Sequence, residues 1–425
     1  MPFFTAAPWY GAKRAVKWPR ITWQRARRAQ EEQTKVEKTF CVVGAGFSGA
    51  VVARHLASRG HRVVVVDERP HLAGNCHTER DSQTGVMVHR FGPHIFHTAN
   101  ARVWAYVQRF GTFRPYVNRV RAIARGQVFS LPINLATINQ LFKTTLGPAQ
   151  ARAFIASKAD HSITTPRTFR EQALSMVGPE LYETFFEGYT RKQWGCEPDT
   201  LPASILKRLP LRFNYDDNYF NHPYQGMPEA GYTAIVQAIL AEFAHRIDIR
   251  LGARFEDMAE PFDHVFYTGP LDRFFGFRLG RLAYRTLDFE RFVSPEPDYQ
   301  GTAVINYCDA DVPYTRIAEH KHFAPWEQAQ FEQSVYFREY SRAAQPQDTP
   351  YYPIRLSGEQ PLLQGYEDLA RASTGVSFLG RLGTYRYLDM DVTIHEALQA
   401  CDQVDSILAS QGPGALPAFF TPTAP

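Results

Sequence analysis

The sequence predicts an α/β protein: a two-part Rossmann-like domain with a helical insertion domain and an antiparallel sheet domain. Residues 39–67 read as buried strand, glycine turn, helix and buried strand, the order of a βαβ unit with parallel strands. Short buried strands return late in the chain, at 264–268 and 376–379. A mainly helical stretch and a stretch of strand-like alternation separate these parts, so we expect the parallel sheet to be built from discontinuous segments.

Each expected element rests on a local pattern. Thr39–Val43 is an apolar run, Phe47–Ser58 is a helix that ends before Gly60, and Arg62–Asp67 is a second apolar run. Further helices are expected at 148–157, 168–177, 180–187, 203–207, 231–245 and 392–408. Further strands are expected at 247–251, 264–268 and 376–379, with strand-like alternation over 282–340 and a polar, aromatic loop at 380–389.

These elements divide the chain into domains. We expect a discontinuous nucleotide-binding domain from 38–98, 226–280 and 370–410. A mainly helical domain at 99–225 includes a short strand region near 116–131, and an antiparallel sheet domain follows at 281–369. Tails of 1–37 and 411–425 complete the chain.

Composition excludes several classes of protein. The chain has 425 residues, 44% of them hydrophobic, enough for a large core and two or three domains. A formal net charge of +4 is weak for a nucleic-acid binder, so no nucleic-acid partner is expected. Five scattered cysteines without CxxC spacing predict neither a metal site nor a disulfide framework and favour a reducing compartment, the cytoplasm. We find no apolar run that would span a membrane or serve as a signal peptide.

The N-terminal tail is unusually basic. Its first thirty residues hold seven Lys or Arg, no acidic residue, and tryptophans at 9, 18 and 23. A disordered tail, or a misplaced start of the chain, is the interpretation we favour. The second is an arm in weak contact with an anionic membrane surface, with tryptophan at the interface and basic residues on headgroups. The third is a transit peptide, against which the lack of serine counts.

A Gly-x-Gly-x-x-Gly turn precedes the first helix, at Gly44, Gly46 and Gly49. The first glycine permits a tight turn, the second lets the backbone approach a pyrophosphate, and the third lets the helix pack on the strand. The helix N-terminus, with Phe47 and Ser48, then offers free N–H groups to phosphate oxygens. The turn therefore predicts a dinucleotide cofactor.

The segment after the second strand adds to this site. Asp67 ends the strand and is placed to accept hydrogen bonds from a ribose diol. Glu68, Arg69 and the Gly74-Asn75 pair follow it. Arg381 and a late helix that begins near Asp391 favour FAD over NAD, because a helix N-terminus stabilises negative charge on a reduced flavin ring.

Several runs along the chain match one family. They are 92–98 (GPHIFHT), 188–195 (GYTRKQWG), 218–220 (NYF), 224–226 (YQG), 267–270 (YTGP), 312–316 (VPYTR), 319–323 (EHKHF), 350–353 (PYYP) and 385–390 (YRYLDM). With these runs in this order, the chain resembles the bacterial UDP-galactopyranose mutases over about 39–408.

The resemblance implies an FAD-dependent isomerase that interconverts UDP-galactopyranose and UDP-galactofuranose for glycan biosynthesis. It implies that FAD works in its reduced form, supplied by an external reductant such as NAD(P)H, and attacks the anomeric carbon without net redox change. It also implies a homodimer and a mobile lid in the helical domain. Two alternatives stay open: a flavin oxidoreductase of the amine-oxidase or desaturase type, and a flavin-binding partner protein with an inactive site. Neither alternative needs paired arginines for a diphosphate.

The resemblance assigns catalytic and substrate-binding residues. Arg208, in the lid, and Arg316 hold the diphosphate, and His97 responds to the redox state of the flavin. Tyr189 stacks on uracil and Trp194 lines the sugar and lid region. The remaining substrate contacts are hydrogen-bonding groups, namely Tyr219, Tyr352 and Tyr387 for phosphate or sugar, and Asn118 and Asn306 for substrate or uracil.

The resemblance also assigns cofactor contacts. His94 and His97 lie against the flavin, Arg285 serves its side of the pocket, and Arg381, Asp389 and Met390 bind FAD. Three positions depart from the family pattern. Pro93 removes an N–H before His94, Ala73 stands at the first glycine of a Gly-Gly-Asn run, and Cys308 replaces a hydroxyl residue.

Overall fold

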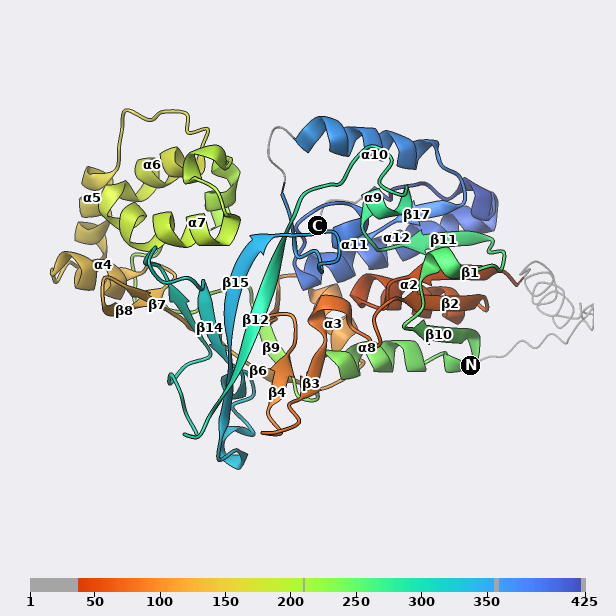
Figure 1. Ribbon diagram of the computed structural model, residues 1–425, viewed down its shortest axis with the longest axis horizontal. Coiled ribbons are helices and arrows are strands. Elements are labelled where there is room, and N and C mark those ends of the chain that lie inside the picture. Colours follow the sequence, from red (N-terminus) through yellow and green to blue (C-terminus); the bar gives the residue numbers. More distant parts are fainter. Residues whose placement is uncertain (1–36, 209–210, 355–358, 422–425) are drawn as a thin grey trace, which may run out of the picture. The chain divides into compact units, whose positions relative to one another are not determined.

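A computed structural model describes residues 37–208, 211–354 and 359–421, with Lys207 and Arg208 described by their backbone only. The predicted basic tail, and with it the three interpretations of its role, lies outside the described residues apart from residue 37. Thr39 to the C-terminus forms one compact unit, drawn in Figure 1. None of the helices described is both long and apolar enough to cross a bilayer.

A five-stranded parallel sheet forms the nucleotide-binding half, in the order β10-β2-β1-β11-β17. Its central strand β1 lies in parallel register with β2 and β11, so that Val42 stands beside both Val65 and Phe266. The bounds are β1 Thr39–Val43, β2 Arg62–Asp67, β10 Ile247–Leu251, β11 His264–Tyr267 and β17 Val376–Phe378. Widely separated parts of the chain thus form one sheet, and the predicted Rossmann-like α/β class is confirmed.

Helices cover this sheet on both faces (Figure 1). On one face α2 packs against α12 and α8, and a hydrophobic cluster joins them to Phe40, Val42 and Val65. On the other, α9 and α10 pack through a second cluster that includes Tyr366 and Phe378. The bounds are α2 Phe47–Ser58, α3 Ala101–Gln108, α8 Gly231–Ala241, α9 Leu271–Phe274, α10 Gln360–Ala372, α11 Gly380–Gly383 and α12 Met390–Ser410.

A seven-stranded sheet follows, in the order β16-β12-β15-β14-β13-β7-β8. Neighbours pair antiparallel except β13 and β7, which are parallel, so the predicted strand region near 116–131 joins this sheet. The bounds are β7 Val120–Ala124, β8 Gln127–Leu131, β12 Tyr284–Ser294, β13 Val304–Tyr307, β14 Arg316–Glu319, β15 Ser334–Ala343 and β16 Tyr352–Pro353. Two small sheets consist of β5 Phe96–Thr98, β9 Tyr224–Pro228 and β6 Phe113–Pro115, and of β3 Thr78–Arg80 and β4 Met87–His89.

The helical segment lies at the β7–β8 end of this sheet (Figure 1). Helix α6 kinks at Gly178 (φ +76°), where a Cβ atom would lie 2.5 Å from the carbonyl oxygen of Lys158, and Pro179 follows. The helix predicted at 180–187 consists of the end of α6 and a π-helical turn over Tyr182–Glu187. The bounds are α4 Leu135–Phe142, α5 Pro148–Lys158, α6 Phe169–Leu181, η2 Tyr182–Glu187, α7 Gly188–Trp194 and the 3-10 helix η4 Ala203–Arg208.

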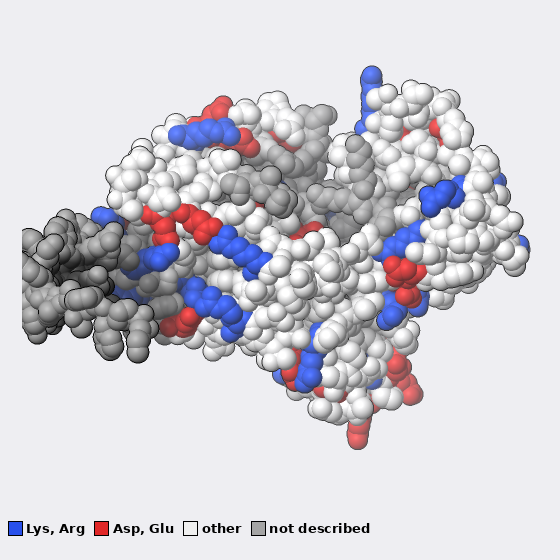
Figure 2. All heavy atoms as spheres, turned by 180° about the vertical axis from the view of Figure 1, so that it is seen from behind, with Lys and Arg blue, Asp and Glu red and all other residues white. Residues whose placement is uncertain are grey.

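Two features near the C-terminus differ from the sequence expectations. The predicted loop at 380–389 is wrong in its first part, because Gly380–Gly383 forms the short helix α11. The segment after α12 packs on the fold: Leu416 and Ala418 are buried, and the Phe378 N–H donates to the Ala418 carbonyl at 2.7 Å. Figure 2 shows Lys and Arg side chains interspersed with Asp and Glu on one face, as expected from a small net charge.

Candidate functional site

A cavity of about 1200 Å³ lies among the carboxyl ends of β1 and β2, the antiparallel sheet and the helical segment. This volume suits a dinucleotide together with a second ligand. Gly49, Trp194 and Arg285 are predicted site residues that are not part of its lining. Those that line it are Gly44, Gly46, Phe47, Ser48, Asp67, Glu68, Arg69, Gly74, Asn75, His94, His97, Asn118, Tyr189, Tyr219, Asn306, Arg316, Tyr352, Arg381, Tyr387, Asp389 and Met390.

The glycine turn is as tight as its sequence requires. Gly44 has φ +105°, and a Cβ atom there would lie 2.0 Å from Oγ1 of Thr268. A Cβ atom at Gly49 would lie 1.9 Å from the Gly44 carbonyl oxygen, so this glycine serves the packing of α2 on β1 and not the cavity. The Asp67 carboxylate accepts a hydrogen bond from the Ala45 N–H at 2.9 Å, which ties the end of β2 to the turn.

A second loop closes on the turn. Ala73 adopts left-handed backbone angles (φ +72°), and its N–H donates to the Ala45 carbonyl at 2.9 Å. This conformation is one that glycine adopts freely and alanine does not, which explains why a glycine is expected there. A Cβ atom at Gly74 would lie 3.5 Å from Cα of Gly46. The backbones of Gly46 and Gly74 thus face each other without side chains between them, which leaves their N–H groups open to a pyrophosphate.

Two helix N-termini meet at the same cavity. Helix α2 contributes Phe47 and Ser48, and α12, which begins at Met390, contributes its first turn with Asp389 as N-cap. Near them Gly380 has φ +71°, and a Cβ atom there would lie 2.8 Å from Oγ of Ser48. Both N-termini carry partial positive charge, so this side of the cavity suits an anionic, dinucleotide-sized cofactor.

The opposite side holds a buried cluster around Arg316. Nη2 of Arg316 donates to the Tyr189 hydroxyl at 2.6 Å, and Nε lies 3.4 Å from Oε1 of Glu339. Burial raises the pKa of Glu339, although Arg316 opposes the shift, and it raises the pKa of Tyr189 to about 12. Burial disfavours the charged guanidinium, but Glu339 and the surrounding tyrosines together outweigh it and raise the pKa of Arg316. Arg316 is therefore a cation held in a fixed orientation, and it faces the cavity, where an anionic ligand can bind.

Polar groups around Arg316 point to a ligand. Oδ1 of Asn118 and Oδ1 of Asn306 are buried, and neither has a hydrogen-bond partner among the described residues. The Tyr219 N–H donates to the Asn118 carbonyl at 2.8 Å, which places these two predicted residues side by side. Buried polar atoms are normally paired, so these oxygens fit a bound donor.

Aromatic rings and one arginine line the wall between the two sides. The rings of Tyr352 and Tyr387 stack with centroids 5.7 Å apart, and Cζ of Arg381 lies 4.9 Å from the Tyr387 ring centre. Arg381 also donates to the Tyr351 carbonyl at 2.5 Å. The Arg381 guanidinium is therefore held in place both by the Tyr387 ring and by the Tyr351 carbonyl.

The two predicted histidines have different surroundings. Burial lowers the pKa of His94 to about 4, and its ring Nδ1 lies 2.8 Å from the Gly92 carbonyl oxygen. The His97 ring stacks on Phe220 at 3.7 Å, and its Nδ1 lies 2.7 Å from Nδ1 of His222. In that pair one nitrogen donates and the other accepts. Burial lowers the pKa of His97, opposed by Asp389.

Trp194 and Arg285 lie outside the cavity lining. Trp194 packs against a hydrophobic cluster with Leu201 and Leu206. Nε of Arg285 donates to the Gln193 carbonyl at 3.1 Å. The side chain of Arg208 lies outside the described residues. Glu339 is the residue that sequence reasoning missed: it is one acidic position in an alternating strand, and no motif marks it.

Comparisons with known proteins agree with this geometry. Residues 184–387 match the UDP-galactopyranose mutase family, and residues 42–110 match an NAD(P)-binding Rossmann-like domain. The chain is 57% identical to the Klebsiella pneumoniae protein described as "Probable UDP-galactopyranose mutase", over 91% of this chain and 99% of that protein. It is 52% identical to dTDP-fucopyranose mutase of Escherichia coli, over 85% of this chain and 97% of that one.

A solved structure shares the fold. The crystal structure of reduced UDP-galactopyranose mutase superposes with a TM-score of 0.69 at 14% identity, over 91% of this chain and 99% of that one. Both sequence relatives are mutases, so the oxidoreductase alternative is not favoured. The relatives that span the chain, the matched profile and the cavity agree: the chain belongs to the UDP-galactopyranose mutase family.

Proposed function

We propose that the protein interconverts UDP-galactopyranose and UDP-galactofuranose with FAD as its cofactor. Family membership and the dinucleotide-binding fold imply a flavin-dependent mutase that acts on a UDP-sugar. The observation that carries the proposal is the placement of Arg316, with Tyr189 and Glu339, across one cavity from the glycine cradle.

The cavity fits FAD on the cradle side. Gly46 and Gly74 carry no side chains into this part of the cavity, so a pyrophosphate can approach their backbone, and the N-termini of α2 and α12 supply N–H groups to anionic oxygens. Reduced FAD supplies a ring nitrogen that is nucleophilic toward an anomeric carbon. In our proposal, His94 and His97 face its ring system, and an external reductant such as NAD(P)H supplies the electrons.

The chain's own residues then retain and orient the nucleotide. Arg316 pairs with the diphosphate oxygens, and Arg208, from a mobile lid, adds a second guanidinium when substrate is present. Tyr189 lies against the uracil, and Asn118 and Asn306 donate or accept at the substrate. Tyr219, Tyr352 and Tyr387 donate hydrogen bonds to phosphate or sugar oxygens, and Trp194 serves the lid region. Holding UDP beside the sugar keeps the recombination effectively intramolecular.

A second nucleotide sugar competes for this assignment. The Escherichia coli relative is named for dTDP-fucopyranose, at an identity close to that of the Klebsiella relative. Both substrates present a pyrimidine nucleoside diphosphate, and they differ in a ring methyl, a ribose hydroxyl and a sugar hydroxyl. We propose the UDP-sugar because the profile matched by residues 184–387 is that of the UDP-galactopyranose mutases.

Product analysis tests the proposal. Flavin-loaded protein, reduced with dithionite, is incubated with UDP-galactofuranose or dTDP-fucofuranose, and the products are separated by ion-exchange chromatography. We expect UDP-galactopyranose to form only with reduced protein. Turnover of the dTDP sugar alone would reassign the substrate, and equal turnover by oxidised protein would falsify the requirement for reduced FAD.

Three further assignments are proposals of the same kind. All five cysteines are free thiols, which supports a cytoplasmic location. We propose a homodimer on family grounds, with the helical segment 99–225 at the interface, and a weak membrane contact through the basic tail. Analytical ultracentrifugation and liposome pelleting of the full chain, with a variant lacking residues 1–36, test the last two.

A further inference from the structure

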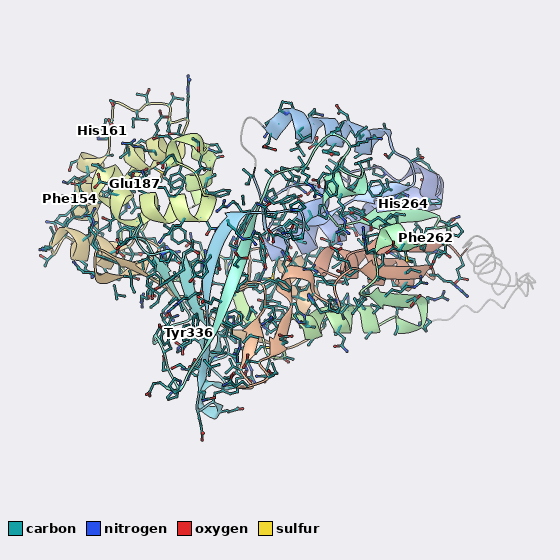
Figure 3. The ribbon with its side chains drawn as sticks, viewed as in Figure 1. Phe154, His161, Glu187, Phe262, His264 and Tyr336 are labelled. Atoms are coloured by element: carbon teal, nitrogen blue, oxygen red, sulfur yellow. The ribbon has the colours of Figure 1, made fainter. Side chains whose placement is uncertain are left out.

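Helix α7 packs on the turn that joins β13 to β14 and also contributes to the cavity lining. Glu187, labelled in Figure 3, is the residue before this helix. From the helix Tyr189 reaches the cavity and meets Arg316, the first residue of β14. The position of α7 on the β13–β14 turn therefore determines the position of Tyr189 relative to Arg316.

Lys192 fastens the helix to that turn. Its ammonium group donates to three backbone carbonyl oxygens, those of Tyr307 at 2.7 Å, Asp309 at 2.8 Å and Tyr314 at 3.2 Å. An ammonium has three N–H donors, so these contacts use its full capacity. The side chain is partly buried, and burial lowers the pKa of Lys192. Because all three donors of Lys192 bind backbone carbonyls, the side chain fixes the position of α7 relative to the β13–β14 turn.

Gly188 lies one helical turn before Lys192, on the same face of α7. A Cβ atom there would lie 2.4 Å from the Cys308 carbonyl oxygen and 3.1 Å from the Ala310 nitrogen. The helix therefore approaches the turn as closely as a glycine permits, and Lys192 is attached to the same turn four residues later.

A separate contact holds the other end of the helix. Nε of Arg285 and Oγ of Ser341 both donate to the Gln193 carbonyl, at 3.1 Å and 2.6 Å. This anchor comes from β12 and β15 and does not use the β13–β14 turn. Loss of the Lys192 contacts should therefore shift α7 on the hairpin without releasing the helix from the protein.

We propose that Lys192 is a positioning residue of the UDP site, which acts by holding Tyr189 and Arg316 in register. This inference rests on the proposed function, because it needs UDP as the ligand. Lys192 is not among the described residues that line the cavity, so its effect on UDP must pass through the two elements that it joins, helix α7 and the β13–β14 turn.

The test compares Lys192→Met with Arg191→Met in flavin-loaded protein. Arg191 is the adjacent cation on the same helix, but it is exposed and pairs with Glu187 at 3.1 Å and Glu197 at 2.9 Å. We expect K192M to raise the Kd for UDP, measured by flavin fluorescence, and the KM for UDP-galactofuranose about tenfold. The kcat should stay within about threefold, because contacts to UDP exist in both ground and transition states. R191M should change each value less than twofold.

A double-mutant cycle with Tyr189→Phe identifies the route of the effect. If Lys192 acts through Tyr189, the pair of substitutions should raise the Kd for UDP clearly less than the product of the single effects. Multiplicative effects, an unchanged Kd in K192M, or a kcat loss at constant KM would each overturn the inference. If K192M fails to fold, Lys192→Arg takes its place. A planar guanidinium does not reproduce the pyramidal arrangement of the three ammonium donors, so a Kd raised about threefold is expected and a wild-type Kd would overturn the inference. Failure of the wild-type protein to bind UDP would instead refute the proposed function.

Discussion

The Tyr189 hydroxyl accepts a hydrogen bond of 2.6 Å from Nη2 of Arg316, across the boundary between helix α7 and strand β14. Glu339 lies on the other side of the guanidinium, with Oε1 3.4 Å from Nε. Two neighbours therefore orient the cation while several of its N–H groups stay available. This arrangement suits an anion that arrives, leaves and must be held in the same place each time.

Substitution of Arg316 should remove the diphosphate contact and spare the cofactor. Each hydrogen bond to a charged group contributes about 1.5–3 kcal/mol, so the loss of two should lower turnover of UDP-galactofuranose by about a hundredfold or more in Arg316→Ala. Arg316→Lys should recover only part of this, since a point charge lacks the planar fork. Steady-state kinetics and flavin absorbance measure both effects. Near-normal turnover in Arg316→Ala would contradict the assignment, and Arg114→Lys, in the exposed pair with Glu229, is the control.

Gly188→Ala should displace α7 even though alanine favours a helix more than glycine does. The added methyl group meets backbone atoms of Cys308 and Ala310, which cannot rotate away. We expect a lower free energy of unfolding, by about 1–3 kcal/mol as for an overpacked site, and weaker UDP binding with flavin retained. Gly414→Ala is the matched control, because a Cβ atom there meets nothing within 4 Å. Equal urea midpoints for the two variants would rule out the close approach.

Ala73→Gly should be almost neutral. Left-handed backbone angles disfavour alanine by about 1–2 kcal/mol, which offsets the lost burial of a methyl group, about 0.8 kcal/mol, and the extra freedom of glycine in the unfolded chain. Ala57, buried within α2, has no such strain, so Ala57→Gly should lower the free energy of unfolding by about 1–2 kcal/mol. Urea denaturation compares the two, and equal losses would show that Ala73 is unstrained.

Buried histidines should make the protein sensitive to mild acid. Burial lowers the pKa of His94 to about 4 and of His320 to about 3, and it lowers the pKa of His89 as well. Between pH 6.5 and pH 4 the unfolded chain binds protons that the folded chain excludes. Stability is therefore complete above pH 6.5 and falls as the pH falls, by about 1.4 kcal/mol per pH unit for each histidine.

His320→Asn isolates one of these groups. Nδ1 of His320 accepts a hydrogen bond from the His89 N–H at 3.1 Å, and an asparagine oxygen can take that place without titrating. The difference in unfolding free energy between pH 7 and pH 5 should be smaller in the variant than in the wild-type protein. An unchanged difference would show that His320 does not contribute to the acid sensitivity.

Secondary-structure elements that are specified by local interactions could be predicted from local sequence patterns. The strands at 39–43 and 62–67 and the helix at 47–58 end where predicted, because apolar runs and a glycine turn specify them within a few residues. The role of Gly49 in helix packing is likewise confirmed by the Gly44 carbonyl 1.9 Å from its Cβ position. Most of the site residues that the glycine turn and the family resemblance assigned line one cavity.

Other features depend on contacts that are distant in sequence. The hairpin β7–β8 completes a sheet by pairing with β13, about 180 residues away, and α10 is stabilised by a cluster around Tyr366 that forms only in the folded chain. Glu339 gains its place beside Arg316 through the pairing of β14 with β15. Arg285 illustrates the reverse case: the resemblance assigns it to the flavin side of the pocket, whereas its side chain meets the end of α7.

The order of strands in the parallel sheet also bears on biosynthesis. Strand β17 and helix α12 are among the last elements of the chain, yet one completes an edge of the sheet and the other supplies a wall of the cofactor's compartment. A nascent polypeptide therefore leaves the ribosome almost entirely before it can capture its nucleotide. Products truncated upstream of 376 would keep the phosphate-binding turn but lack both β17 and the part of the cavity wall that α12 supplies.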